Sequence, residues 1–545
     1  MRYEVIVVGG GAAGLTAAAY AARAGKTVAV FEKQQELGGL VRTVNRGGFV
    51  FDLGLRAIEN SGIVLPMAAE LGLPLKYVKS RVSLGIADRI IRIESKEALA
   101  EYRRLLESFY PESRSEIEAI LEVIEGIMKD MDVLYGIDNP LFKDLKQDAS
   151  YLLRTLLPWS VRFFFTIGRI NRLNAPIEEF LAALTSNGSL RSIIGQHFFR
   201  YTPAFFALSY FSVFLDYLYP EGGTGTLMNL LAEYAQTKGA SIHRGTPIVK
   251  VKPGSRTVVG GDGAEYGYGA LIWAADSNGL YAAVDSSGMS DRKARRAIEL
   301  RRQELQRSGS GDSVFSVFLS VDESPEYFRS RSEGHFFYTP DPRGLGDLHT
   351  RGLQELLARY DRLDDPVRDV KEYVRRFLSL NTFEISIPVL KDPSMAPAGK
   401  TGLIVSWLFD YTLMKKIREA GWYEEFKEFC IAEIVRILSR TVYPGLEGKI
   451  LDRFASTPLS IADYTGSTGG AITGWAFGPG KAPVIHKIQQ VARSVLTPMK
   501  DVYQAGQWVY SPSGLPIAIL TGKLAANRAA RRGSRKRLPS LRRAP

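Results

Sequence analysis

The sequence predicts an α/β protein whose sheet domain is assembled from three separate stretches of chain, with one helical and one α+β segment between them. Three observations lead to this fold class. The chain begins with a short apolar run, a glycine-rich turn, a segment of small residues and a second apolar run, which is the order of a βαβ unit. Strand and helix patterns return after residue 218 and again after residue 500. A sheet that continues after such long interruptions indicates a split domain.

The opening βαβ unit carries the complete pattern of an adenine dinucleotide site. Tyr3 to Val8 predicts a buried strand, and Gly9, Gly11 and Gly14 follow it with the spacing GxGxxG. These glycines allow the tight turn, the approach of main chain to the pyrophosphate and the close packing of helix on strand. Glu32 ends the second predicted strand, where a carboxylate accepts hydrogen bonds from ribose hydroxyls and disfavours the 2′-phosphate of NADP. The alternative is an ordinary βαβ unit with a glycine-rich turn.

Two later glycine motifs narrow the expected ligand to FAD. Gly38 and Gly39 lie just past the ribose-binding acid, where main chain without side chains can run close beneath a flat ring system. Near the C-terminal end, a turn that contains Gly514 and Pro516 opens a helix of small residues, whose first N–H groups can donate to polar atoms of a flavin. The sequence contains a single dinucleotide fingerprint, so we expect no second domain for stable binding of NAD(P)H.

Composition excludes several classes of site. An apolar content of 45% and a charged content of 23% are typical of a globular protein. The single cysteine, Cys430, excludes an internal disulfide framework and a multi-cysteine metal or iron–sulfur site, and it indicates a reducing compartment. The five histidines lie far apart and form no local metal signature, so no metal site is expected.

The net charge of +12 is concentrated at the C-terminal end. From Arg528 to Arg543 the chain carries eight basic residues and no acidic one. This run is either a solvated tail or a segment that binds an anionic membrane surface, and we expect no nucleic-acid partner. The longest uncharged runs, Val5 to Ala22 and Tyr201 to Leu215, predict neither a signal peptide nor a membrane span. We therefore expect a cytoplasmic protein, peripheral on the inner face of the membrane if it binds lipid.

Residues 58–218 have a mostly helical pattern and contain two aromatic clusters, one between Pro158 and Phe165 and one between Phe198 and Phe214. An aromatic stripe at helical spacing is typical of a core. The competing interpretation is the wall of an apolar tunnel or a membrane-associating face, because arginines such as Arg154 and Arg162 flank the first cluster. Further along, 285–445 combines charged helices with strands such as Ser313 to Val321, and the Gly- and Thr-rich stretch Thr457 to Trp475 predicts a loop.

The order of these motifs resembles the phytoene desaturase, carotenoid isomerase and retinol saturase family of FAD-dependent oxidoreductases, which is more distantly similar to flavin amine oxidases. The resemblance rests on Gly9 to Glu32, Leu37-Gly38-Gly39, Phe51-Asp52-Leu53-Gly54, Tyr219-Pro220-Glu221-Gly222-Gly223, Trp273-Ala274-Ala275-Asp276, Ile387-Pro388, Asp392-Pro393, Ala396-Pro397, Thr457-Pro458 and Ala505-Gly506-Gln507-Trp508 through Gly522. Two positions depart from the family pattern. Leu40 stands where an Arg often follows the glycine pair, and Gln507 stands where an Asp often follows the glycine of the end motif.

The resemblance implies a split Rossmann-type FAD-binding domain with an inserted α+β substrate domain and a helical insertion. The expected divisions are 1–57, 219–284 and 446–528 for the FAD-binding domain, 58–218 for the helical region that contacts substrate or membrane, 285–445 for the substrate domain and 529–545 for a basic disordered tail. The residues expected to contact FAD are Gly9, Gly11, Ala12, Ala13, Gly14, Glu32, Lys33, Gly38, Gly39, Leu40, Arg42, Thr43, Gly54, Val249, Gly506, Gln507, Gly514, Leu515, Pro516 and Ile517.

Three functions are compatible with these patterns. The first is an FAD-dependent oxidoreductase that desaturates, saturates or isomerises an apolar isoprenoid or polyene lipid of the carotenoid or retinoid kind by flavin hydride chemistry. The second is a flavin amine oxidase, although no aromatic cage or lysine near the flavin can be placed. The third is a non-catalytic lipid-binding escort, which would not need both FAD motifs. The sequence identifies neither the catalytic side chain nor the electron acceptor.

Overall fold

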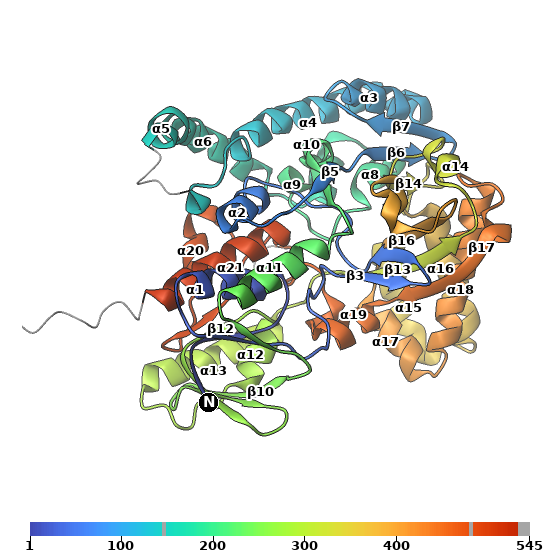
Figure 1. The fold of residues 1–545 in the computed structure, drawn as a ribbon. Helices are drawn as coiled ribbons and strands as arrows, with labels where there is room; N and C mark the ends of the chain where they lie inside the picture. Colours follow the sequence, from blue (N-terminus) through green and yellow to red (C-terminus); the bar gives the residue numbers. More distant parts are fainter. Residues whose placement is uncertain (144–148, 479–482, 532–545) are drawn as a thin grey trace, which may run out of the picture.

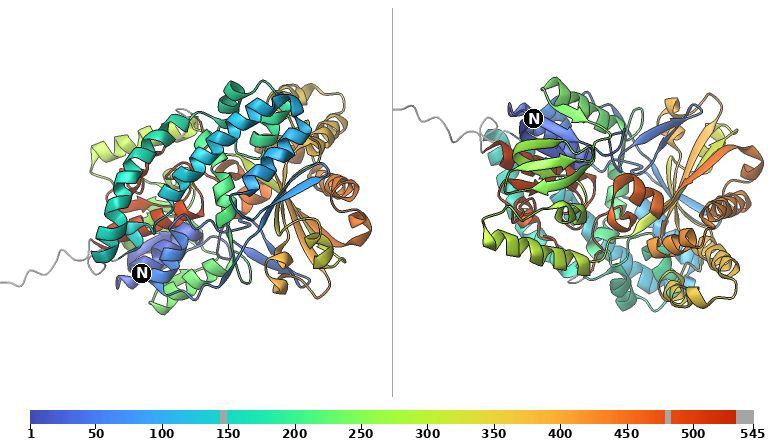
Figure 2. Two further views of the ribbon diagram at one scale, coloured as in Figure 1. Left: turned by 90° about the horizontal axis from the view of Figure 1, so that it is seen from above. Right: turned by 90° about the horizontal axis from the view of Figure 1, so that it is seen from below.

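The computed structural model describes residues 1–143, 149–478 and 483–531. Within these ranges the strands form two seven-stranded sheets and two short two-stranded ones. The two large sheets lie on opposite sides of the molecule (Figures 1 and 2), and α3 (Ala98–Phe109), α4 (Arg114–Leu134) and α6 (Leu157–Ile170) lie above them in Figure 1. The basic tail expected at 529–545 lies almost wholly outside the described residues.

The first large sheet is built from three distant stretches of chain, as predicted for a split domain. Its strand order is β10-β11-β12-β1-β2-β9, and β18 pairs with the end of β12. β1, β2, β9, β12 and β18 run parallel to their neighbours in this group. Their bounds are β1 (Arg2–Val8), β2 (Val28–Phe31), β9 (Ser241–His243), β10 (Ile248–Lys252), β11 (Thr257–Gly260), β12 (Glu265–Trp273) and β18 (Val502–Gln504).

Helices cover both faces of this sheet. One face packs on α1 (Ala12–Arg23), α11 (Thr226–Thr237) and α21 (Leu515–Ala530), which share one apolar core with Val5 and Val7. The other face packs on α12 (Ser277–Ala283) and α13 (Arg292–Arg307), whose buried residues join Ile6 and Trp273. Apolar side chains on both faces of β1 explain its continuous apolar run.

The second large sheet has the order β17-β13-β16-β15-β14-β6-β7. One face is apolar and packs on α16 (Pro366–Leu380), α17 (Tyr411–Glu419) and α18 (Tyr423–Arg440). The opposite face is turned toward the first sheet and carries polar residues. The strand bounds are β6 (Val82–Ile86), β7 (Arg89–Ile93), β13 (Ser313–Val321), β14 (His335–Thr339), β15 (Phe383–Ser386), β16 (Thr401–Phe409) and β17 (Ile450–Ser456).

A helical layer lies along the top of the molecule in Figure 1. Its helices are α3 (Ala98–Phe109), α4 (Arg114–Leu134), α5 (Ala149–Tyr151), α6 (Leu157–Ile170), α7 (Ile177–Leu184), α8 (Gly188–Gly195), α9 (Ala204–Leu208) and α10 (Tyr210–Asp216), and most of them share one apolar cluster. None of the helices in the described part of the chain has the length and apolarity that crossing a bilayer requires. The remaining elements are α2 (Val64–Leu71), α14 (Pro325–Arg329), α15 (Leu353–Arg359), α19 (Pro458–Thr465), α20 (Val491–Ser494), β3 (Thr43–Arg46), β4 (Phe49–Asp52), β5 (Tyr77–Lys79) and β8 (Leu218–Pro220).

The structure differs from the sequence-based description at four points. Region 58–218 is not wholly helical, because β6 and β7 form a hairpin that pairs with β14 of the second sheet. α13, placed with the substrate domain, packs on the first sheet, whereas β17, placed with the FAD-binding domain, pairs with β13. The stretch expected to be a loop contains α19, which begins with a capping box between Thr457 and Ser460 and ends at Gly466 in the left-handed region.

Candidate active site

The predicted dinucleotide turn joins β1 to α1 in the geometry that its glycines require. A Cβ atom on Gly14 would lie 1.9 Å from the carbonyl oxygen of Gly9, so only glycine allows this packing of helix on turn. α1 begins after Gly11 and has no side-chain cap on its first N–H groups. An uncapped helix N-terminus at the end of a parallel strand is suited to a diphosphate.

Glu32 is held beside this turn by two backbone groups. The N–H of Gly10 donates to its Oε2 at 2.7 Å, and the N–H of Gln34 donates to its Oε1 at 2.9 Å. Each carboxylate oxygen keeps a second lone pair for a ribose hydroxyl. The neighbouring Lys33 turns away from the turn, because its Nζ donates to the carbonyl oxygen of Asp463 at 3.1 Å.

The two ends of the chain meet at this place. A Cβ atom on Gly506 would lie 3.4 Å from the Cβ of Ala13, and one on Gly522 would lie 2.5 Å from the carbonyl oxygen of Ala13. The N–H of Ala505 donates to the carbonyl oxygen of Trp273 at 2.9 Å, which joins the end motif to the first sheet. The prediction that the N-terminal and C-terminal glycine motifs converge is therefore confirmed.

A second uncapped helix begins nearby. α21 starts at Leu515, with Gly514 as its N-cap and Pro516 in its first turn, and no side chain caps it. The hydroxyl of Ser513, one residue before the cap, is buried and has no hydrogen-bond partner among the described residues. Buried polar groups are almost always paired, so this hydroxyl and the free N–H groups of α21 fit the polar atoms of a bound flavin nucleotide.

The glycine pair lies directly against the dinucleotide turn. The N–H of Gly38 donates to the carbonyl oxygen of Gly10 at 2.8 Å. Leu40 and Gly54 then run side by side, since a Cβ atom on Gly54 would lie 2.0 Å from the carbonyl oxygen of Leu40. Arg42 continues this segment, and its guanidinium lies over the ring of Tyr464 at 4.9 Å. The segment from the glycine pair to Thr43 thus forms one wall of the same site.

Asp52 connects this wall to the second stretch of the split domain. The buried carboxylate accepts hydrogen bonds from the hydroxyl of Thr43 at 2.8 Å, the N–H of Thr224 at 2.8 Å and the hydroxyl of Tyr219 at 2.6 Å. Burial, with a contribution from Asp52, raises the pKa of Tyr219, so the phenol stays a donor. Two motifs that are far apart in sequence are therefore a single hydrogen-bonded unit.

Two predicted positions lie at the edges of the site. Val249 is 55% exposed and faces no residue of β11, because the register shifts between Ile248 and Lys250. Its backbone is therefore outside the ladder. Gln507 donates from Nε2 to the carbonyl oxygen of Ala471 at 3.4 Å, so its side chain contacts protein. Among the predicted residues, the side chains of Lys33, Arg42, Thr43 and Gln507 contact other protein groups.

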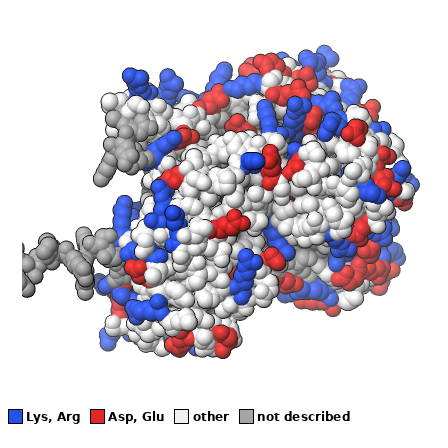
Figure 3. Space-filling model, in the orientation of Figure 1, with Lys and Arg blue, Asp and Glu red and all other residues white. Residues whose placement is uncertain are grey.

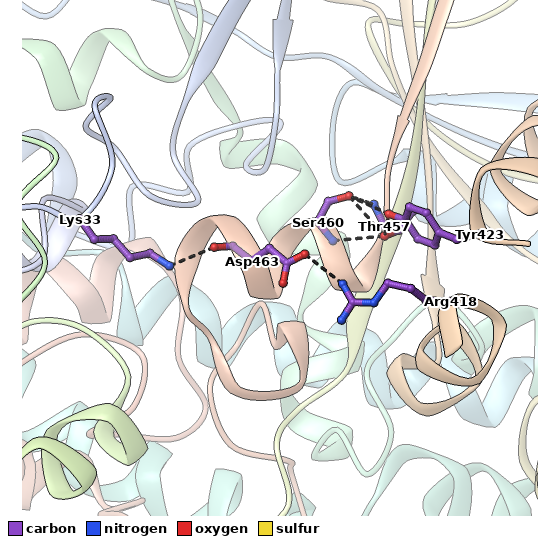
Figure 4. Close-up of polar contacts among 6 residues, drawn as sticks. All are labelled: Lys33, Arg418, Tyr423, Thr457, Ser460 and Asp463. Carbon is purple, nitrogen blue, oxygen red and sulfur yellow. Dashed lines mark hydrogen bonds and ion pairs between the residues drawn. The ribbon is translucent and has the colours of Figure 1, made fainter. Parts of the chain in front are cut away.

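α19 connects the nucleotide turn to the second sheet's helices (Figure 4). The carbonyl oxygen of Asp463 accepts a hydrogen bond from Nζ of Lys33. Its carboxylate accepts one from the guanidinium of Arg418 in α17 at 3.2 Å. At the other end of the helix, the hydroxyl of Tyr423 in α18 lies 2.8 Å from the hydroxyl of Thr457. This short helix therefore links the segment beside the nucleotide turn to the helices that cover the second sheet.

The polar face of the second sheet forms the opposite wall. Phe337, Glu384, Ser406 and Ser316 lie directly opposite one another across β14, β15, β16 and β13, so their side chains share this face. The serines are buried, whereas the side chain of Glu384 is 35% exposed. A row of polar residues on a covered face is unusual for a structural sheet and is typical of a site.

Buried charges converge on this row. Arg56 donates to the hydroxyl of Ser406 at 3.0 Å, and the Nε2 of His335 lies 3.0 Å from the Oε1 of Glu384. Burial alone would raise the pKa of Glu384, but His335 and the charges of Arg56 and Lys391 outweigh it and lower that pKa. Burial lowers the pKa of Lys391 to about 7, although Asp52 and Glu384 oppose the shift.

An apolar cavity of about 70 Å³ continues from this row into the helical layer. Its walls include Leu84, Ile124, Ile194, Tyr210, Phe214 and Phe337. His197 also lines it, and burial lowers the pKa of this imidazole to about 4, so it is neutral at pH 7. The second aromatic cluster of the sequence therefore contributes to a cavity wall as well as to the core.

These residues fit FAD: two uncapped helix N-termini, a positioned ribose acid and an unpaired buried hydroxyl lie around one convergence of glycines. Sequence reasoning missed Arg56, His335, Glu384 and Lys391, because no local pattern shows that a charged residue is buried. In the described residues no group of acidic, histidine and cysteine side chains is arranged to hold a metal ion.

Comparison with known proteins agrees with this site. The family model for flavin-containing amine oxidoreductases matches residues 12–530. The chain is 23% identical to all-trans-retinol 13,14-reductase of Danio rerio over 92% of this chain and 82% of that protein. It is 26% identical to 4,4′-diaponeurosporene oxygenase of Staphylococcus aureus over 48% of this chain and 52% of that protein. A solved structure of putrescine oxidase superposes with a TM-score of 0.59 at 15% identity and covers 98% of this chain and 99% of that one. The chain therefore belongs to the family of flavin-containing amine oxidoreductases and is an FAD-dependent oxidoreductase.

Proposed function

We propose that this chain reduces or oxidises a carbon–carbon bond of an apolar polyene, with a retinoid or carotenoid as substrate. The observation that carries the proposal is the apolar cavity that ends at the polar row of the second sheet. Its walls are aliphatic and aromatic, with His197 and a few hydroxyls as the polar exceptions. Apolar walls bind apolar ligands by burial of surface, and a volume of about 70 Å³ would receive one part of a polyene chain. The relatives named above for retinol and diaponeurosporene support a polyene.

Each wall of the site has a distinct task in this proposal. When bound, FAD supplies hydride chemistry at its isoalloxazine ring. The glycine motifs and Glu32 hold the nucleotide, and the segment from Gly38 to Thr43 supports the ring. The aromatic wall around Phe337 orients the conjugated chain and excludes water. Glu384 and His335 lie beside Phe337, and because the pKa values of both are lowered, this pair would relay the companion proton and not store it.

Saturation is the first direction to test, because the relative that matches across most of the chain is named a reductase. Desaturation and cis/trans isomerisation use the same hydride chemistry and remain alternative directions of the proposed reaction. A polar amine is a weaker substrate candidate. Glu384 could attract an ammonium group, but the positive charges of Arg56 and Lys391, which lower the pKa of this carboxyl, oppose the approach of a further cation.

We further propose that α6 docks on a membrane surface from which the substrate arrives. Four side chains of α6 (Leu157, Val161, Phe164 and Phe165) and Leu153 just before it are 59 to 73% exposed, and Leu153, Leu157, Val161 and Phe165 are spaced four residues apart. The inner face of the helix is anchored, since the indole of Trp159 donates to the carbonyl oxygen of Val133 in α4. The same α4 contributes Ile124 to the cavity wall, so one helix separates the apolar surface from the cavity. α5 and α6 stand at one corner of the molecule in Figure 1.

The experiment that tests the proposed substrate is a direct comparison of ligands. The purified flavoprotein is incubated anaerobically, after chemical reduction, with all-trans-retinol, a carotenoid and putrescine in separate reactions. We expect the polyenes to reoxidise the reduced flavin with a change of polyene absorbance. In parallel reactions that start from oxidised flavin, we expect no detectable product of putrescine oxidation. Amine oxidation without polyene turnover would replace the proposal with an amine oxidase.

A further inference from the structure

A basic cleft opens on the surface at the end of the second sheet where β6 and β14 begin. It has a volume of about 520 Å³ and is lined by Lys79, Arg81, Arg92, Arg329 and Glu333, with Lys391 among its innermost residues. Lys and Arg side chains gather on this part of the surface, near β5 and β7, in the upper part of Figure 3. The four basic rim residues are exposed and Glu333 is partly buried, whereas Lys391 is only 8% exposed. The cleft therefore brings solvent close to a buried lysine.

Lys391 is held by neutral oxygens. Its Nζ donates to the carbonyl oxygen of Arg56 at 3.0 Å and to the hydroxyl of Ser386 at 2.9 Å, and it lies 4.7 Å from the ring centre of Tyr219. Its stem packs against Gly334, where a Cβ atom would lie 2.8 Å from Cγ of the lysine. Among the described residues, Lys391 forms no ion pair within 4 Å, so no salt bridge favours its charged form.

The charged groups around Lys391 come from every element packed on it. Asp52 faces it from the end of β4, Arg56 from the loop after β4, Glu384 from β15, and Glu333 and the rim cations from the cleft. The phenol of Tyr219 is neutral and Asp392 follows in the chain, where its carboxylate accepts the N–H of Gly222. Burial is the largest influence and lowers the pKa of Lys391 to about 7, which matches the acidity that proton exchange near neutrality needs.

The inner end of this arrangement reaches the substrate wall. Ser386, which accepts the lysine hydrogen bond, lies directly opposite His335 in the ladder between β15 and β14. The Nε2 of His335 lies 3.0 Å from the Oε1 of Glu384. Glu384 is opposite Phe337, which lines the apolar cavity. Polar groups thus continue from the cleft to the cavity along one face of the sheet.

We propose that Lys391 exchanges the proton of the reaction between solvent in the cleft and the His335–Glu384 pair. The inference rests on the proposed polyene reaction. Reduction of one C=C bond breaks its π bond and forms two C–H bonds, one from hydride and one from a proton. FAD, when bound and reduced, would supply the hydride with its electron pair, and the proton would reach the substrate carbon from Lys391 by way of Ser386 and the His335–Glu384 pair. Lys391 then recovers a proton from water in the cleft. In the oxidative direction the proton leaves by the same groups.

The first test is independent of turnover. The holoenzyme is labelled with trace acetic anhydride over a pH series, and the extent of acetylation at each lysine is measured by peptide mass spectrometry. We expect Lys391 to acquire reactivity with a midpoint within about one pH unit of 7, well below the exposed lysines of the same digest. Because Glu384 raises this pKa, Glu384→Gln should move the midpoint to still lower pH. A Lys391 that stays unlabelled when the exposed lysines react, or that titrates together with them, overturns the proposal.

The second test uses paired variants. Lys391→Met should slow reoxidation of the reduced flavin by all-trans-retinol at least tenfold and remove the ionisation near pH 7 from the rate profile, while ammonium chloride, unlike potassium chloride, restores part of the rate through the cleft. Lys400→Met, at an exposed lysine paired with Asp322, should leave the rate and profile unchanged. Flavin content and melting temperature establish that each variant folds, and Lys391→Gln replaces the methionine variant if it does not.

These outcomes separate the two proposals. If wild-type protein converts all-trans-retinol and Lys391→Met keeps the wild-type rate and pH profile, the role of Lys391 is wrong while the polyene reaction stands. If wild-type protein converts no polyene, the proposed function fails, and the labelling midpoint still decides whether Lys391 exchanges protons with solvent.

Discussion

The Cβ position of Gly506 lies 3.4 Å from the Cβ of Ala13, although almost the whole chain separates these two residues. The contact places the uncapped N-terminus of α1 and the turn that leads to α21 around one site. A diphosphate and a flavin ring can be held only if both ends are folded together. Binding of FAD therefore depends on completion of the first sheet, and the predictions below use this dependence.

Substitution of Gly14 should abolish FAD binding. Gly14→Ala would place a methyl group 1.9 Å from the carbonyl oxygen of Gly9, so the helix must move away from the turn that faces the diphosphate. We expect the purified variant to contain at most a tenth of the wild-type flavin, measured by absorbance after FAD is added. Gly126→Ala in α4 is the matched control, because a Cβ there meets no atom within 4 Å and alanine favours a helix. Normal flavin content in Gly14→Ala would contradict the assigned turn.

The stability of the protein should rise with pH between about 7 and 10 because of Lys391. The lysine has a folded-state pKa of about 7 and an unfolded value of 10.5, so the unfolded chain binds the extra proton in this window. Folding is therefore penalised below about pH 7, by an amount on the order of a few kcal/mol, and the penalty is relieved as pH rises. Chemical denaturation should show a steeper gain for wild type than for Lys391→Met. Parallel stability curves for the two proteins would show that the lysine titrates normally.

Changes in cavity size should alter polyene binding and leave FAD in place. Ile194→Trp adds volume in the cavity wall and should weaken binding of all-trans-retinol at least tenfold, whereas Phe214→Leu removes part of the opposite wall and should tolerate bulkier polyenes. Binding is measured by quenching of intrinsic fluorescence, and flavin absorbance is the control for folding. Equal affinities in both variants and wild type would place the substrate elsewhere.

The apolar face of α6 should determine membrane binding. Phe164→Ser combined with Phe165→Ser removes two exposed rings, each of which contributes roughly 1.5 to 3 kcal/mol when buried in lipid. Co-sedimentation with anionic vesicles should fall at least tenfold. Leu300→Ser on α13 removes a side chain that is 56% exposed on a different helix and should leave sedimentation unchanged. If the double variant and wild type sediment alike, α6 is not the docking surface.

The sequence predicted the parts of the fold that depend on local pattern. β1, the glycine turn and β2 follow from an apolar run, fixed spacing and a second apolar run, and the structure has all three in place. The α19 helix was taken for a loop because glycines and threonines dominate its surroundings, although Thr457, Pro458 and Gly466 are start and stop signals. The β6–β7 hairpin was not predicted, because most of region 58–218 has a helical pattern.

The site could be predicted only where the chain itself carries a motif. The nucleotide turn is such a motif, and its convergence with Gly506 was expected from the family order. Arg56, Glu384 and Lys391 form a cluster only after β15 and the loop following β4 meet. From the sequence alone, Lys391 cannot be distinguished from a solvent-exposed lysine before a turn. Burial converts it into a group that titrates near neutrality, and burial is a property of the whole fold.

The central claim is tested most directly by single turnover of the reduced flavoprotein with all-trans-retinol in the absence of oxygen. We predict that flavin absorbance returns to the oxidised form while a product heavier by the mass of H₂ accumulates in equal amount. A purified protein that binds no FAD, or a reduced flavin that stays reduced in the presence of retinoids and carotenoids alike, would contradict the account.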